Sequence, residues 1–199
     1  MSNLVVLFPG IGYTCDRPLL YYARKVAEEA GYDKVISIPY SRVNKKGLRK
    51  DPEKMMNVFR TLYRDSTKRL EEVDWCDCDK ILFISKSIGT VISCAIENDI
   101  TKEWNNNPDK EYALPPIKQI LFTPLEETFG YYPQNAMGFI GTDDPWCSYE
   151  EVIRLANKQF IALNRYPGAN HSLETGDIPT DINNLNEVMS KCKYFITNC

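Results

Sequence analysis

Short runs of β-branched and aromatic residues alternate along the chain with longer stretches whose apolar positions repeat at helical spacing. Residues 3–8, for example, are almost wholly apolar and end at a Pro-Gly pair, which is typical of a buried strand. The same criteria predict strands over 3–8, 34–38, 80–84, 117–122, 136–140 and 158–164, and helices over 17–30, 53–73, 88–98, 149–156 and 181–195. The polar stretch 101–113 is predicted as a surface loop.

Strands that alternate with helices in this way indicate an α/β protein. We expect one domain over residues 1–199, with a mainly parallel sheet of about six strands and helices on both faces. In such sheets the ligand crevice lies at the carboxyl ends of the strands. The residues that directly follow each strand are therefore the ones to search for function.

Composition narrows the class of protein further. The formal charge of −3 and the pI near 5.3 give no general reason to bind nucleic acid. No apolar run approaches the ~20 residues that span a bilayer, and the N-terminus lacks the pattern of a signal peptide. Seven cysteines, an odd number without a framework, suit reduced thiols, and Cys76 and Cys78 are too isolated for a zinc site. We expect a cytoplasmic protein that needs no membrane, metal or cofactor.

The chain has a single histidine, His171, in the segment after the strand 158–164. Any histidine-dependent catalysis therefore has one candidate. A lone histidine is more often an ordinary surface residue, so its place at a strand end is what makes it a candidate.

The third predicted strand runs directly into the segment Ser85–Thr90 and then into a helix. A strand, a sharp turn of small residues and a helix form the context of a nucleophile elbow, in which a strained turn exposes a serine hydroxyl. Ser87 would be the nucleophile, and a helix N-terminus favours the negative charge that develops during acyl transfer. The simpler alternative is that Ser85 and Ser87 only cap the helix.

A candidate acid follows the strand 136–140, in the segment Gly141–Pro145 that contains Asp143 and Asp144. A carboxylate at this place could orient an imidazole, although Asp-Pro is also common in turns. The order serine, aspartate, histidine along the chain is that of the α/β-hydrolase triad.

On these segments, together with Phe8–Gly12 and Gly168–Leu173, the chain resembles the α/β-hydrolase superfamily over nearly its whole length. It is most similar to small members with little or no cap, of the dienelactone-hydrolase and esterase kind. The resemblance implies a three-layer fold that lacks the two N-terminal strands of the family. It also implies Asp144 as the acid, with Asp143 as the alternative, and the backbone N–H groups of Ile11 and Ile88 as the oxyanion hole. Ser85 stands where the family more often has glycine.

Other segments have competing interpretations. Gly10, Gly12 and their surroundings nearly match a dinucleotide fingerprint, but the third glycine and the acidic residue at the end of the next strand are missing. Segment 41–54 carries six basic residues and is either a lid or clamp over the crevice or, as we favour, a solvated loop. Five residues near strand ends could line a substrate pocket: Gly12, Tyr13, Tyr40, Lys86 and Trp146.

The sequence therefore predicts a serine hydrolase that cleaves a small ester or thioester through an acyl-enzyme. Ser87 would attack, His171 would act as base and Asp144 would orient the imidazole. Two alternatives are a non-catalytic ligand-binding protein on the same fold and an acyltransferase that uses the same residues. Substrate identity and oligomeric state stay open.

Overall fold

The computed structural model of the protein describes residues 2–44, 47–106 and 113–198. Within these ranges, six strands form one sheet in the order β2-β1-β3-β4-β5-β6, and every neighbouring pair is parallel. The strands are β1 (Ser2–Phe8), β2 (Lys34–Ser37), β3 (Cys78–Lys86), β4 (Ile117–Phe122), β5 (Asn135–Gly141) and β6 (Ala162–Tyr166). The predicted parallel sheet of about six strands is confirmed.

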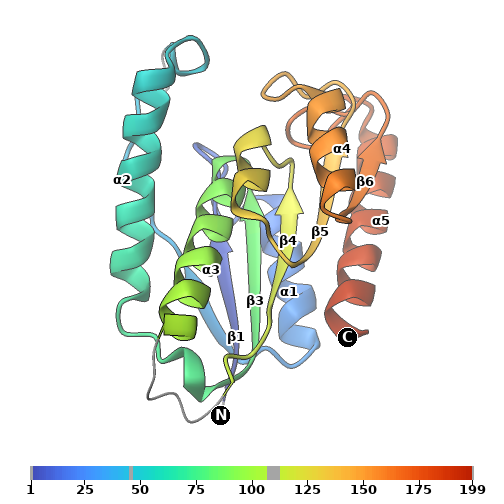
Figure 1. The fold of residues 1–199 in the computed structure, drawn as a ribbon. Coiled ribbons are helices and arrows are strands. Elements are labelled where there is room, and N and C mark those ends of the chain that lie inside the picture. The colour runs from blue at the N-terminus through green and yellow to red at the C-terminus, as the bar shows by residue number, and fades with distance from the viewer. Residues whose placement is uncertain (1, 45–46, 107–112, 199) are drawn as a thin grey trace.

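Helices cover both faces of this sheet (Figure 1). The helices are α1 (Pro18–Glu29), α2 (Pro52–Leu70), α3 (Ile88–Asn106), α4 (Tyr149–Lys158) and α5 (Ile178–Thr197), with short 3-10 helices η1 (Leu48–Lys50), η2 (Trp75–Asp77) and η3 (Glu126–Tyr131). Helices α1 and α5 pack together on one face, and α2, α3 and α4 lie on the other. The expected three-layer architecture is confirmed.

The core divides between the two faces because successive side chains of a strand point in opposite directions. In β1, Val5 and Leu7 belong to the cluster under α1 and α5, whereas Leu4, Val6 and Phe8 belong to the cluster under α2 and α3. All five are fully buried, as expected for a central parallel strand with both faces covered.

Local signals set the helix starts. Asp51 and Asp177 are the N-caps of α2 and α5, and their carboxylates accept hydrogen bonds from the backbone N–H groups three residues later, at 2.9 and 3.1 Å. Helices α1, α2 and α5 carry a proline in their first turn, where its missing N–H removes no helical bond.

The predicted boundaries differ most from the structure at two places. Residues 101–106, predicted as loop, continue α3 through Asn106, and residues 107–112 lie outside the described ranges. Residues 158–161, predicted as the start of a strand, end α4 and form a turn in which Phe160 has a φ of 58° and is 95% exposed. The N–H of Ile161 donates to the carbonyl of Ala156, so this apolar run closes a helix before β6 begins.

The described residues of segment 41–54 are divided among irregular backbone, η1 and the first turn of α2. Leu48 is buried, whereas Arg42 and Lys50 are exposed. Residues 45–46 and the side chain of Arg49 lie outside the described set. Among the helices of the described ranges, none combines the length and the apolarity that crossing a membrane requires.

Candidate active site

Ser87 lies in the turn between β3 and α3, near the middle of the sheet. Its φ of 57° is unusual for a residue with a side chain, and such strain is typical of functional turns. The turn is held from two sides: the Ser87 N–H donates to the carbonyl of Phe122 at 3.0 Å, and the Ser87 carbonyl accepts from the N–H of Thr90 at 2.8 Å. The backbone thus presents the Ser87 side chain at the carboxyl edge of the sheet.

Close packing explains the small residues around Ser87. A Cβ atom on Gly89 would lie 2.3 Å from the carbonyl oxygen of Phe8, so α3 can approach β1 only with glycine at this position. Ser85 is fully buried, and its hydroxyl donates to the carbonyl of Ile120 at 3.2 Å. A serine therefore fits where the resembling family more often has glycine, because β4 satisfies its hydroxyl group.

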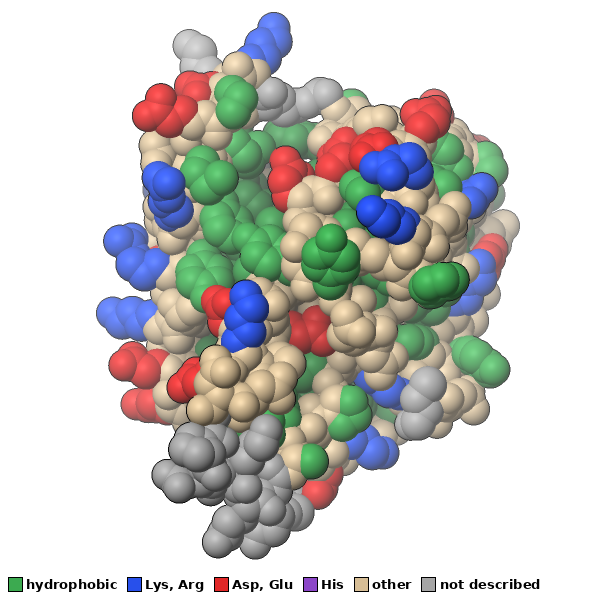
Figure 2. All heavy atoms as spheres, viewed as in Figure 1, with side chains coloured by type: hydrophobic (Ala, Val, Ile, Leu, Met, Phe, Trp, Pro, Cys, Tyr) green, Lys and Arg blue, Asp and Glu red, His purple; other side chains and the backbone are tan. Residues whose placement is uncertain are grey.

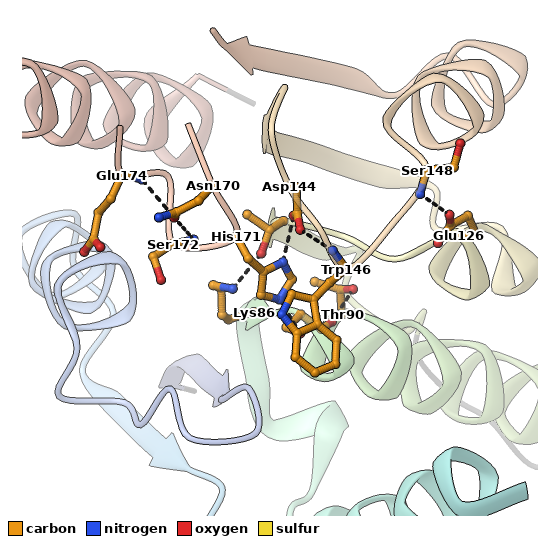
Figure 3. Close-up of polar contacts among 12 residues, drawn as sticks. Lys86, Thr90, Glu126, Asp144, Trp146, Ser148, Asn170, His171, Ser172 and Glu174 are labelled. Carbon is orange, nitrogen blue, oxygen red and sulfur yellow. Dashed lines mark hydrogen bonds and ion pairs between the residues drawn. The ribbon is translucent and has the colours of Figure 1, made fainter. Parts of the chain in front are cut away.

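The structure brings Ser87, His171 and Asp144 together. Figure 3 shows the His171 imidazole beside the Asp144 carboxylate. The Ser87 Oγ lies 2.7 Å from the His171 Nε2, and the His171 Nδ1 lies 2.7 Å from the Asp144 Oδ2. The Asp144 side chain is fully buried, and its Oδ1 accepts from the N–H of Trp146 at 2.8 Å. Side chains from three strand ends thus form a continuous chain of hydroxyl, imidazole and carboxylate, which is the arrangement that a nucleophile, a base and an orienting acid require.

The neighbouring Asp143 has a different environment. It is exposed, and its Oδ1 accepts from the Thr142 hydroxyl at 2.9 Å. Its N–H donates to the carbonyl of Ala169, so the backbone here turns Asp144 and not Asp143 toward His171.

Ile11 and Ile88 both line the cavity of about 160 Å³ around Ser87. Ile11 lies with Gly12 at the tip of a turn that two hydrogen bonds of 3.1 Å close between Gly10 and Tyr13. Ile88 is the first residue of α3. Neither backbone N–H donates to a carbonyl in the turns and loops that the structure describes. Two amides near a nucleophile are the donors that a developing oxyanion requires.

Lys86 is the most unusual residue of the cavity wall. Its side chain is 1% exposed, and its Nζ donates to the Thr123 hydroxyl at 2.6 Å and lies 5.1 Å from the centre of the Tyr13 ring. Burial lowers the pKa of Lys86 to about 7, although the Asp144 carboxylate opposes this shift. Because its side chain is buried and its Nζ donates to Thr123, Lys86 is poorly placed to clamp an anionic substrate.

Of the predicted pocket residues, Gly12, Tyr13, Lys86 and Trp146 line the Ser87 cavity. The Trp146 ring lies 5.7 Å from the His171 ring. Tyr40 does not line this cavity; it lines a separate one of about 550 Å³ behind the Ile11–Gly12 turn. The wall also includes Met55, Leu125 and Ser172, which sequence reasoning missed. Leu125 follows β4 closely and could have been found by the strand-end argument, whereas nothing in the sequence indicates that Met55 reaches Ser87.

No group of three or more His, Cys, Asp or Glu side chains in the described ranges could hold a metal ion. Six cysteines are described, and none of them forms a disulfide; Cys199 lies outside the described ranges.

The architecture and the elbow decide the type of fold. The chain has the α/β-hydrolase fold. A serine hydrolase homologue from Coxiella burnetii matches 96% of this chain and 84% of its own, at 16% identity and a TM-score of 0.58. An α/β serine hydrolase without a lid from Xanthomonas campestris matches 98% and 80%, at 13% identity and a TM-score of 0.59.

A third solved structure with this fold is the ferulic acid complex of Est1E from Butyrivibrio proteoclasticus, which matches 98% of this chain and 88% of its own. Its identity is 11% and its TM-score is 0.63. No protein-family model and no curated protein matches the chain. At these identities the α/β-hydrolase fold is shared, and the chemistry must be argued from the residues of the site.

Proposed function

We propose that the protein is a serine hydrolase that cleaves a small carboxylic ester or thioester through an acyl-enzyme. The observation that carries the proposal is the continuous set of contacts from the Ser87 Oγ through the His171 imidazole to the Asp144 carboxylate. The amides of Ile11 and Ile88 in the same small cavity support it.

The reaction would proceed in two halves. Ser87 attacks the acyl carbon while the His171 Nε2 takes the hydroxyl proton, and the negative oxygen of the tetrahedral intermediate accepts from the Ile11 and Ile88 N–H groups. Asp144 holds the proton on Nδ1, so Nε2 is the basic nitrogen. His171 then protonates the leaving alcohol or thiol, and a water that His171 deprotonates releases the acid from Ser87.

The proposal is tested with a fluorophosphonate probe and a set of short p-nitrophenyl esters. We expect labelling at Ser87 and a loss of kcat/KM of at least about 10³-fold in Ser87→Ala and in His171→Ala, because each removes a reacting group. Ser190→Ala, on the exposed part of α5, is the matched control and should keep both properties.

Absence of labelling and of turnover in the wild type would refute the proposal, as would full esterase activity in His171→Ala. Ligand binding that Ser87→Ala leaves intact, without turnover in either protein, would favour a binding protein on this fold. Faster product formation when an alcohol or amine acceptor is added would indicate acyl transfer.

A further inference from the structure

An apolar groove of about 600 Å³ lies between α2 on one side and the first turn of α3, η3 and residues 145–148 on the other, and it continues the Ser87 cavity. The two spaces share four lining residues, Met55, Ile88, Leu125 and Trp146. Ile88 directly follows Ser87, so the groove begins one residue from the proposed nucleophile. A substrate held by its acyl carbon at Ser87 therefore has, on this side, a neighbouring space large enough for an extended substituent.

The helical repeat brings apolar side chains of α2 and α3 to the groove wall. Ile88 and Val91, three residues apart, lie on one face of α3 and both line the groove. Met55 and Phe59, four residues apart, line it from α2. The groove thus has apolar side chains of both helices in its wall, and a linear or flat apolar group can lie against them.

Figure 2 shows hydrophobic side chains gathered in a hollow beside α2, with acidic side chains at its rim. The groove lining includes the carboxylates Glu126 and Glu127 and no described lysine, arginine or histidine. Glu126 already accepts from the Ser148 N–H, whereas Glu127 is exposed. Carboxylates at the rim repel anions. They therefore select against substrates in which the end remote from the scissile ester carries an acidic group.

Two other cavities fit this role less well. The cavity of about 550 Å³ that contains Tyr40 shares with the Ser87 cavity only the residues of the turn Gly10–Gly12. The cavity beside Glu97 and Trp104 shares no lining residue with the Ser87 cavity.

We infer that the groove between α2 and α3 binds an uncharged apolar chain or ring on one side of the scissile ester, and that the preferred substrates are esters of this class. The inference rests on the proposed hydrolase function. Burial of each methylene would then stabilise the transition state, and Glu127 would lower the rate for chains that end in a carboxylate.

The first experiment is a chain-length series on the wild type, with p-nitrophenyl esters from acetate to octanoate. Complete burial of one methylene strengthens binding about fourfold, and partial burial in a groove that is open on one side strengthens it about twofold. Octanoate has about six methylenes more than acetate, so its kcat/KM should be higher by about 60-fold. A second series of acetate esters with alcohols of increasing length shows whether the groove takes the acyl or the alcohol part. A flat response in both series would overturn the inference.

The second experiment fills the groove. Val91→Phe places a ring in the groove wall and should lower the octanoate-to-acetate ratio by about tenfold or more. Val43→Phe, the same substitution in the separate cavity, is the matched control and should leave the ratio unchanged. Phe59→Ala, which enlarges the groove instead, should shift the preferred chain length upward. A ratio that is insensitive to both groove variants would overturn the inference.

The third experiment tests the charge at the rim. We expect the p-nitrophenyl monoester of octanedioic acid to react about tenfold more slowly than the octanoate ester. Glu127→Lys should narrow this gap several-fold, and Glu150→Lys, on the exposed first turn of α4, should not. An unchanged gap in Glu127→Lys would exclude the charge argument.

Failure of the inference and failure of the proposed function are distinguishable. Labelling of Ser87 and turnover of acetate report the hydrolase function, whereas the ratio of long to short esters reports the groove. A protein that labels at Ser87 but has no length preference would be a hydrolase without this specificity.

Discussion

At the residue scale, the most informative comparison is between the two adjacent aspartates, Asp143 and Asp144. The sequence allows both to serve as the acid, because both follow β5. Their environments differ completely: Asp144 has a fully buried side chain bonded to His171, and Asp143 is exposed and bonded to Thr142. A buried carboxylate beside the imidazole stabilises the imidazolium far better than a solvated one.

This difference predicts opposite outcomes for two matched substitutions. Asp144→Asn should lower kcat by roughly 10³–10⁴-fold, because an amide at this place favours the wrong imidazole tautomer. Asp143→Asn should change kcat by no more than about twofold, since the residue contacts no reacting group. Steady-state kinetics on one short ester measures both. Equal losses in the two variants would contradict the assignment of the acid.

At the element scale, the elbow between β3 and α3 positions the whole site. The sequence predicts this elbow because a buried strand, small residues and a helix follow one another without interruption. Element ends were harder to predict: α3 runs past its predicted end to Asn106, and the apolar run at Phe160 turns instead of extending. The pattern cannot distinguish these cases, because apolar periodicity does not show at which residue the backbone hydrogen bonds of a helix end.

The close approach of α3 to β1 predicts that Gly89 is irreplaceable. Gly89→Ala places a Cβ atom 2.3 Å from the Phe8 carbonyl oxygen and should lower the free energy of unfolding by about 1–3 kcal/mol through overpacking. Esterase activity should fall as well, because a displaced α3 would move the Ile88 N–H group that we propose as an oxyanion donor.

Gly130→Ala is the matched control, since no atom outside its own stretch of chain lies within 4 Å of the position that its added methyl group would take. Urea unfolding followed by circular dichroism, together with ester turnover, compares the two variants. A Gly89→Ala protein as stable and as active as Gly130→Ala would contradict the packing argument.

At the scale of the whole molecule, a buried polar network links α3 to β4 beneath the site. Glu97 accepts from the Gln119 Nε2 at 2.6 Å, and the Ser93 hydroxyl donates to the Gln119 Oε1 at 2.8 Å. Glu97 is only 8% exposed, and burial raises the pKa of its carboxyl to about 7, against the opposing effect of the Gln119 hydrogen bond.

The raised pKa makes stability depend on pH with a definite sign. Between about pH 4.5 and 7 the folded state holds the Glu97 proton and the unfolded state does not, so stability falls as the pH rises through this window. Glu97→Gln keeps an acceptor for Gln119 and removes the charge. Its free energy of unfolding relative to wild type should therefore be unchanged near pH 4 and higher by at most about 3 kcal/mol at pH 8.

Denaturation by urea at several pH values measures this difference. Glu150→Gln, on the exposed side of α4, is the control and should show no such pH-dependent gain. A constant difference between Glu97→Gln and wild type across the pH range would show that Glu97 does not titrate in this window.

The sequence by itself determined the alternation of strands and helices, the parallel sheet and the strand ends that carry Ser87, Asp144 and His171. These features depend on local periodicity and chain order, which the residue pattern alone displays. Only the tertiary structure decided which aspartate faces His171, that Tyr40 lies in a separate cavity, and that α2 brings Met55 beside Ser87. Such contacts join residues far apart in the chain, and they depend on how the helices pack against the sheet rather than on any local pattern.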